Sequence, residues 1–355
     1  MTALHAPARI LIVALRRLGD VLLTTPLIRS LKRAYPDAAI DVLVFKGTEG
    51  ILAGNPDIAD VIAMPERPGA GVSFALLRKL RRRYDLAIST QSGDRPTFYA
   101  WAAGRRSAGF VEGDGALARL KRFALTHPVD VVGGTHRVPE VLRLAQALGV
   151  APVSELVAPR GSPGVAPSRP YAVIHAAPMY RYKRWTDEGW RGLASALAAR
   201  GLAVVATGGP GDKDELDAIW GVRPEVKRLD GALSWPELAG LIQGASVYLG
   251  PDTSVTHLAA ATGTPTVALY GPTDPRLWGP WPTGGLDSVW DAAGTIQARG
   301  NVWLVQNPLP CLPCQQEGCL RRRDSHSQCL DELSLGQVLK AVDAALADPA
   351  GRRSA

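Results

Sequence analysis

Residues 245–271 constrain the fold most, because they are typical of one strand–turn–helix–strand unit of an α/β protein. A mostly apolar run, residues 245–249, leads into a polar turn that opens a helix of small residues. Gly263 and Pro265 end this helix, and a second apolar run follows at residues 266–270. We therefore expect two neighbouring parallel strands joined by a short helix.

The polar turn of this unit carries Asp252, Thr253 and Ser254 at the start of the helix, with His257 one helical turn further on. Free backbone N–H groups and the positive end of the helix dipole make such a place an anion site. Hydroxyl groups beside it suit a phosphate or a sugar nucleotide. The alternative is plain N-capping, since Asp, Thr and Ser are the usual capping residues, and His257 then has a structural role.

Strand and helix patterns alternate in both halves of the chain, which predicts α/β domains with doubly wound parallel sheets. Strands are predicted at residues 9–15, 39–45, 61–64, 86–89, 171–176 and 202–207, and helices at 21–35, 74–83, 186–200, 214–220 and 334–346. Residues 151–170 are rich in Pro, Gly and Ser and predict a linker. The predicted domains are 1–160 and 161–332, followed by a helix and tail at 333–355. A ligand would bind in a cleft between the facing domains.

The turn after the first strand carries a candidate base. Gly19 permits a tight turn and Asp20 opens the next helix, with Arg16 and Arg17 just before them. Asp20 either caps the helix or takes a proton from a substrate hydroxyl. A dinucleotide-binding loop would need G-x-G-x-x-G, and this turn has one glycine, which argues against an NAD-dependent dehydrogenase.

Two further turns of the second half carry charged residues. Lys183 can contact a phosphate as a point charge, and Arg184 can add a second contact. The Gly-rich turn at 208–211 allows close approach of a nucleotide, and a carboxylate there, such as Glu215, can bind ribose hydroxyls. Asp-x-Asp at 212–214 matches a metal–nucleotide signature over three residues only, so we interpret it as chance.

The formal net charge is +7, with basic clusters such as residues 78–83. Such clusters face anionic partners or are simply solvated. Aromatic residues do not interleave with them, so nucleic acid is not an expected partner. No apolar stretch reaches the roughly 18 residues of a membrane helix, and the N-terminal apolar run is too short for a signal peptide. We expect a cytoplasmic protein with peripheral contact to the inner membrane.

All four cysteines lie in one segment, residues 311–329: Cys311, Cys314, Cys319 and Cys329. Four thiols in a short cytosolic stretch favour metal ligands over disulfides. Four thiolates would hold a structural zinc or iron ion and leave no open position for catalysis. The alternatives are free thiols and conditional disulfides.

Several motifs occur together in the order seen in one enzyme family. They are Gly19-Asp20-Val21-Leu22 with Pro26, Lys183-x-Trp185 with Trp190, Asp252-Thr-x-x-x-His257-Leu-x-Ala-Ala, Gly263-x-Pro265 and Gly271-x-Thr273-x-Pro275. The chain resembles glycosyltransferase family 9, the heptosyltransferases of the lipopolysaccharide inner core. The Cys311-x-x-Cys314 segment resembles the branch that adds the third heptose.

This resemblance implies a GT-B architecture of two Rossmann-like domains, an ADP-heptose donor bound by the C-terminal domain and a lipid A–core acceptor bound by the N-terminal domain. It implies inverting transfer without a catalytic cofactor. The carried-over roles are general base for Asp20, acceptor binding for Arg16, Arg17 and Gly19, and donor binding for Lys183, Glu215, Asp252, Thr253, Ser254 and His257. The chain departs from the family pattern at Ala177, Pro178 and Ser254, which puts the phosphate contacts there in doubt.

Other functions fit the same expected scaffold. A sugar-nucleotide epimerase would release free sugar without an acceptor, and a non-catalytic protein would bind the core oligosaccharide only. A further alternative is a glycosyltransferase that uses another donor or a protein acceptor. Assays of donor hydrolysis and transfer, with and without acceptor, separate these alternatives.

Overall fold

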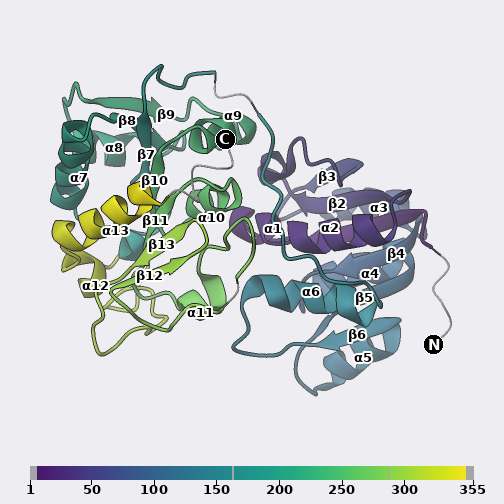
Figure 1. Ribbon diagram of the computed structural model, residues 1–355. Coiled ribbons are helices and arrows are strands. Elements are labelled where there is room, and N and C mark those ends of the chain that lie inside the picture. Colours follow the sequence, from purple (N-terminus) through teal and green to yellow (C-terminus); the bar gives the residue numbers. More distant parts are fainter. Residues whose placement is uncertain (1–5, 162–163, 287, 349–355) are drawn as a thin grey trace. The chain divides into compact units, whose positions relative to one another are not determined.

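The computed structural model describes residues 6–161, 164–286 and 288–348, and the chain divides into two compact units (Figure 1). The first unit is Met1–Pro159 and the second is Arg160–Ala355. Each unit is built around its own sheet. Among the described residues, no helix is both long and apolar enough to cross a membrane.

The first unit has a six-stranded sheet in the order β3-β2-β1-β4-β5-β6, and every strand pair is parallel. The strands are β1 Arg9–Ala14, β2 Ala39–Phe45, β3 Asp60–Met64, β4 Tyr84–Ser89, β5 Gly104–Val111 and β6 His127–Asp130. The helices are α1 Leu18–Leu22, α2 Thr25–Ala34, α3 Ala70–Leu80, α4 Asp94–Ala103, α5 Ala116–Ala124 and α6 Arg137–Ala147, with a 3-10 turn at Glu49–Leu52. The predicted doubly wound parallel sheet is confirmed here.

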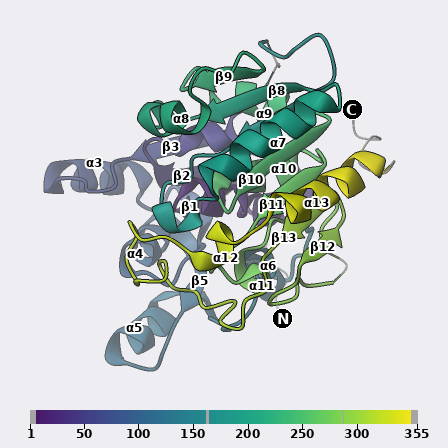
Figure 2. The ribbon, with the colours of Figure 1, turned by 90° about the vertical axis from the view of Figure 1, so that its left-hand side faces the viewer.

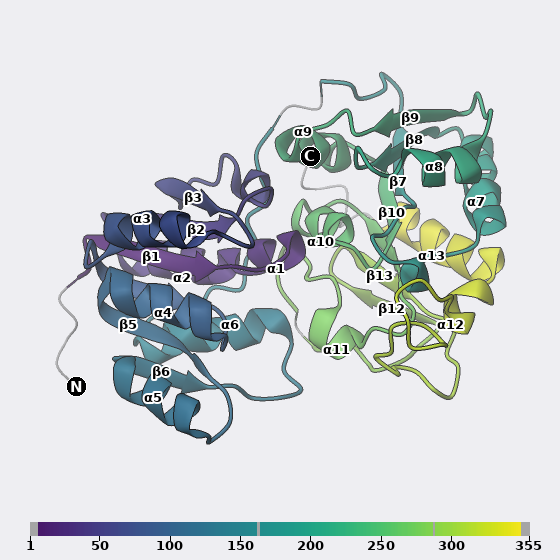
Figure 3. The same ribbon diagram turned by 180° about the vertical axis from the view of Figure 1, so that it is seen from behind.

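Helices cover both faces of this sheet. The connections from β3 to β6 run in one direction across the sheet, and right-handed crossovers therefore place α3, α4 and α5 on one face (Figure 3). α2 and α6 pack together on the other face. The central strands β1, β2 and β4 are almost fully buried, as the apolar run of β1 predicts, whereas the edge strands β3 and β6 are partly exposed.

The single helix predicted at residues 21–35 is wrong, because two helices occupy this stretch. α1 ends at Leu22 and α2 begins at Thr25, with Pro26 in its first turn. Proline lacks an N–H group and its ring clashes with the carbonyl four residues earlier, so it starts a helix and does not continue one. The Thr25 hydroxyl donates instead to the Leu22 carbonyl, at 2.8 Å.

The first part of the predicted linker is also packed. The Val153 N–H donates to Ser30 Oγ at 2.8 Å, and the Val157 N–H donates to Thr25 Oγ1 at 3.0 Å. Glu155 forms an ion pair with Arg29. Residues 153–157 therefore lie along α2, because two buried hydroxyls satisfy their backbone groups.

The second unit has a seven-stranded sheet in the order β12-β13-β11-β10-β7-β8-β9. Its strands are β7 Tyr171–His175, β8 Ala203–Gly208, β9 Val226–Asp230, β10 Val247–Pro251, β11 Thr266–Leu269, β12 Ile296–Arg299 and β13 Val302–Val305. Its helices are α7 Asp187–Ala199, α8 Lys213–Trp220, α9 Trp235–Gln243, α10 Ser254–Ala261, α11 Pro275–Trp278, α12 Gln328–Asp331 and α13 Leu335–Ala347, with a 3-10 turn at Arg181–Lys183. Among the strands that the structure describes in this unit, only β12 is antiparallel to its neighbour, and it lies at the sheet edge.

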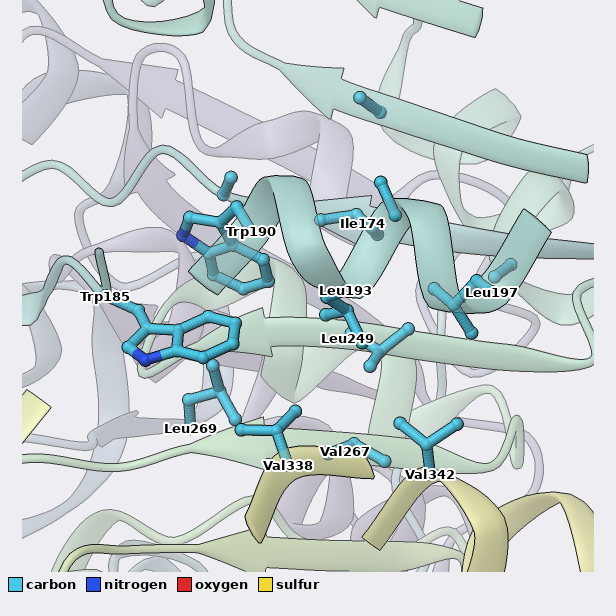
Figure 4. Packing of buried hydrophobic residues seen from close by; sticks show 14 of the residues in the cluster. Ile174, Trp185, Trp190, Leu193, Leu197, Leu249, Val267, Leu269, Val338 and Val342 are labelled. Atoms are coloured by element: carbon cyan, nitrogen blue, oxygen red, sulfur yellow. The ribbon is translucent and has the colours of Figure 1, made fainter. Parts of the chain in front are cut away.

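The core of the second unit is organised by two tryptophans. Trp185 and Trp190 meet edge to face with ring centroids 5.1 Å apart, and Figure 4 shows them beside apolar side chains of α7, α13 and the sheet. The Trp185 indole N–H donates to the Leu333 carbonyl at 2.7 Å. Gly189 permits this packing, since a Cβ there would lie 2.5 Å from the Trp185 ring. The contacts of Trp185 with Trp190 and with the Leu333 carbonyl thus join the start of α7 to the segment before α13.

Candidate functional site

In the first unit, the candidate base lies at the carboxyl end of β1. Asp20 sits in the first turn of α1, and its side chain is 14% exposed. Arg16, which precedes the helix, places a guanidinium nitrogen 3.7 Å from Asp20 Oδ1. The Asp20 carbonyl accepts from the Thr24 hydroxyl at 2.9 Å, which ties α1 to the start of α2. Asp20 is thus a nearly buried carboxylate beside a cation.

A second cation near Asp20 comes from a distant part of the sequence. Arg137 opens α6 and is buried, and its Nε lies 3.8 Å from Asp20 Oδ1. Its other nitrogens donate to the Thr90 carbonyl at 2.8 Å and to Glu140 at 3.3 Å. Burial lowers the pKa of Arg137, and the charges of Asp20 and Glu140 oppose that shift. Arg137 is therefore held in place by three elements, with one face toward Asp20.

In the second unit, the candidate donor residues follow neighbouring strands. Lys183 comes after β7, Glu215 after β8 and Asp252 after β10, while Thr273 comes after β11. These four strands are adjacent and parallel, in the order β11-β10-β7-β8. Because the carboxyl ends of parallel strands meet at one sheet edge, all four residues lie along the same edge. Ligands of doubly wound sheets bind at such edges.

The Asp252 carboxylate is the centre of this group. Lys183 Nζ lies 2.6 Å from Oδ2, which also accepts from the Thr273 hydroxyl at 2.6 Å. Oδ1 accepts from the Tyr270 hydroxyl at 3.3 Å, and that hydroxyl also donates to the Trp278 carbonyl at 2.8 Å. Both carboxylate oxygens therefore have protein donors, which suits a positioning residue better than a base.

Electrostatics favours the charged form of Asp252. Burial by itself would raise the pKa of its carboxyl, but the charges of Lys183 and His257 and the hydrogen bonds from Lys183 and Thr273 bring that pKa below its ordinary value. Lys183 keeps a fifth of its side chain exposed, whereas Asp252 is buried. Asp252 thus holds the Lys183 ammonium group at the sheet edge.

The turn that follows Asp252 is held by several hydrogen bonds. Thr253 caps α10, and its side chain accepts from the Thr256 N–H at 3.4 Å. The Thr256 hydroxyl donates to the Pro251 carbonyl and contacts the Tyr248 hydroxyl, both inside the protein. Ser254 is the first helical residue and is partly exposed, while His257 is buried and faces the Asp252 charge. Capping and an anion site are therefore compatible at this turn.

Glu215 lies in the same row but is joined to another cation. Its Oε1 is 2.8 Å from Arg184 Nε, and both side chains are partly exposed. Burial raises the pKa of Glu215, and the nearby Arg184 charge opposes that shift. The adjacent residues Lys183 and Arg184 therefore contact the carboxylates that follow β10 and β8 respectively.

At the end of β7, His175 is buried with its Nδ1 3.3 Å from the Thr207 hydroxyl. Burial lowers the pKa of His175 to about 4, against smaller opposing effects of Asp212 and Thr207. The folded protein thus keeps this imidazole neutral at pH values where an unfolded chain protonates it.

We expect the free energy of unfolding to depend on pH through His175. As pH falls from 6.5 toward 4, the unfolded chain binds the proton first, so stability is lost, by at most roughly 3 kcal/mol. Denaturant unfolding at pH 7.5 and at pH 4.5 measures this loss. In His175→Gln the loss should be smaller than in the wild type by about that amount. Equal losses in the two proteins would show that another group is responsible.

The four cysteines do not form the expected metal centre. Cys311 and Cys319 are exposed, whereas Cys329 is buried in the apolar cluster of the second unit. Among the described residues, no group of three or more His, Cys, Asp or Glu side chains is placed to hold a metal ion. Burial raises the pKa of the Cys329 thiol to about 12, with smaller effects of Cys314, Cys319 and Cys311. The arrangement of the described side chains therefore does not support the expected zinc or iron.

Three residues near the candidate sites were not assigned roles from the sequence. Arg137 carries no local signal, since its partner Asp20 belongs to another strand's turn. Thr273 is part of a quoted motif, and Tyr270 ends an apolar run. Their contacts with Asp252 depend on the pairing of β10 with β11, which no local pattern specifies.

Comparison with known proteins identifies the family. The family model for glycosyltransferase family 9 (heptosyltransferase) matches residues 73–284. The chain is 32% identical to a lipopolysaccharide heptosyltransferase 3 from Escherichia coli, over 74% of this chain and 83% of the relative. It is 27% identical to a lipopolysaccharide heptosyltransferase 1 from Pseudomonas aeruginosa, over 93% of each chain.

Solved structures agree on the fold. An ADP-heptose lipopolysaccharide heptosyltransferase II from Escherichia coli superposes with a TM-score of 0.73 over 95% of this chain and 98% of that chain, at 20% identity. The Escherichia coli heptosyltransferase WaaC with ADP gives a TM-score of 0.72 over 95% and 99%, at 22% identity. The GT-B fold class and the resemblance noted in the sequence, including that to the third-heptose branch, are confirmed. This chain belongs to glycosyltransferase family 9, the heptosyltransferases, and is a glycosyltransferase.

Proposed function

We propose that the protein transfers a heptose from ADP-heptose to a hydroxyl of the lipopolysaccharide inner core, with inversion at the anomeric carbon. We propose that the transferred sugar is the third heptose of the inner core, since two relatives at 32% and 30% identity are named lipopolysaccharide heptosyltransferase 3. The donor proposal is in keeping with a structural neighbour that was solved with ADP-2-deoxy-2-fluoro heptose. The acceptor proposal comes from the relatives' names.

The observation that carries the donor half is the Lys183–Asp252 pair beside the start of α10. ADP is a dianionic to trianionic leaving group, and it gains charge as the glycosidic bond breaks. We propose that Lys183 and the backbone N–H groups at Thr253 and Ser254 stabilise that charge. We propose that Glu215 contacts the ribose or adenine. We also propose that His257 supports the turn, because its charge attracts the Asp252 carboxylate.

The acceptor half is proposed to rest on Asp20. A sugar hydroxyl is too weakly acidic to attack unaided, so Asp20 takes its proton while the oxygen bonds to the anomeric carbon. The bond from that carbon to the diphosphate oxygen breaks on the opposite face, and its electron pair leaves with ADP. Arg16 and Arg137 are proposed to orient the Asp20 carboxylate, and Arg16, Arg17 and Gly19 to line the acceptor side.

A thermal-shift screen tests the donor proposal. A ligand that binds only the folded protein at 100 times its dissociation constant adds about 2.7 kcal/mol of stability, which corresponds to roughly 5–10 °C in melting temperature for a unit of this size. ADP-heptose should give this shift, while UDP- and GDP-sugars at equal concentration should not. A larger shift with another sugar nucleotide would replace the proposed donor.

Transfer assays with and without acceptor test the reaction class. The proposal predicts ADP release that depends on a heptose-deficient core acceptor, with the sugar recovered on that acceptor. Equal ADP release without acceptor, with free sugar as the product, would instead support an epimerase or hydrolase. Binding without turnover would support a non-catalytic protein.

A further inference from the structure

The first unit exposes aromatic side chains on three helices. Phe74 of α3 is 69% exposed, Phe98 and Trp101 of α4 are 47% and 42% exposed, and Phe123 of α5 is 89% exposed. Among the described residues, these four are the only exposed Phe or Trp side chains. Grouped apolar residues on a surface mark an interaction site.

All three helices lie on the same face of the six-stranded sheet, as Figure 3 shows. In Figure 2, α3 and α5 project from this unit. Between α3 and α4 there is a hollow of about 260 Å³, lined by Leu77, Arg81, Arg82, Phe98, Trp101 and Ala102. The aromatic residues of α4 therefore border a recess with two basic residues.

The charge of this face is positive. Residues 67–84 contain six Lys or Arg residues and no Asp or Glu. Residues 115–126 contain three Lys or Arg residues and likewise no Asp or Glu. Lys121 and Arg122 of α5 are matched by Asp94, Asp114 and Asp130. Within the described residues, Arg78, Lys79 and Arg81 have no carboxylate in ion-pair range, so the charge of α3 is available to an anionic partner.

We propose that α3, α4 and α5, here named the α3–α4–α5 face, dock the protein on an anionic lipid bilayer. Aromatic rings favour the headgroup level of a bilayer, and each nearby Lys or Arg adds attraction to anionic headgroups. The exposed residues of α5 favour a bilayer as the partner over a nucleic acid. Leu117 and Leu120 are exposed beside Phe123, and leucine does not stack on bases. The docking does not depend on the transfer reaction, since it needs no sugar substrate.

Vesicle flotation of the full chain tests this proposal. The vesicles are phosphatidylcholine alone, or phosphatidylcholine with three-tenths phosphatidylglycerol, and neither contains a sugar acceptor. The protein should float with the anionic vesicles at low salt, and binding should fall at least about tenfold with neutral vesicles or in 0.5 M NaCl. Failure to bind anionic vesicles at low salt would overturn the proposal.

Two double variants separate the charge from the aromatic rings. Arg78→Glu with Lys79→Glu should lower binding at least about tenfold, and Phe74→Ser with Phe123→Ser should do the same by removing apolar insertion. The matched controls are Lys340→Glu, an exposed lysine of α13, and Val222→Ser, an exposed valine of the second unit.

The vesicle binding of the variants and of the controls shows whether this face carries the docking. Both controls should bind anionic vesicles as the wild type does, and all variants should keep the wild-type melting temperature, since each changed side chain is exposed. Wild-type binding by the Phe74/Phe123 variant would contradict insertion and leave only a polyanion-binding surface. Equal losses in the controls would show that no particular face is responsible.

Discussion

Asp20→Asn should lower kcat about a thousandfold and leave the affinity for ADP unchanged. A positioned general base contributes roughly 10²–10⁴ in rate, and the amide keeps the size of the carboxylate but cannot accept the proton. The residues proposed to hold the donor all belong to the second unit, whereas Asp20 belongs to the first. Steady-state transfer assays measure kcat, and calorimetric titration with ADP measures affinity.

Asp57→Asn is the matched control for this substitution. Asp57 also belongs to the first unit, is also nearly buried and also pairs with an arginine, with Arg29 Nε 2.8 Å away. It should keep wild-type kcat even if some stability is lost. Near-normal turnover by Asp20→Asn would remove Asp20 as the base, and a comparable fall in Asp57→Asn would indicate a general effect of lost ion pairs.

Lys183→Met should weaken the binding of ADP-heptose and destabilise the fold at the same time. The methionine keeps the length of the side chain but removes the ammonium group that contacts the buried Asp252 carboxylate. Breaking a buried ion pair costs about 3–5 kcal/mol. We expect roughly 3 kcal/mol, because Lys183 is partly exposed and Thr273 and Tyr270 still donate to Asp252. Denaturant unfolding and donor titration measure the two effects.

The double variant Lys183→Met with Asp252→Asn separates stability from binding. A neutral amide no longer needs the ammonium group, and its oxygen can accept from Thr273. Stability should therefore recover in large part, while donor affinity stays low because the positive charge is still missing. Recovery of donor affinity together with stability would mean that Lys183 acts on the fold only, and that its contact with the diphosphate is not needed.

Much of the fold follows from local pattern. The apolar run of β1 is buried on both faces, as a parallel strand should be, and β2 spans the residues that its pattern predicts. The helix at 21–35 failed because apolar periodicity continues across Pro26, while the missing N–H of that residue forces a new helix start. Composition also misled at 153–157, where a Pro- and Ser-rich stretch packs on α2 through buried hydroxyls.

The sequence by itself determined the fold class and which turns carry the charged residues, because both depend on periodicity and on residue types close together in the chain. Asp20 and Asp252 follow predicted strands, and the carboxyl ends of parallel strands are where ligands bind. Only the tertiary structure decided the partners of these residues. Arg137 reaches Asp20, and Tyr270 and Thr273 reach Asp252, because strand order brings together turns that are distant in the sequence. The gathering of exposed aromatic side chains on one face has a similar origin, since crossover direction sets which side of a sheet each helix covers.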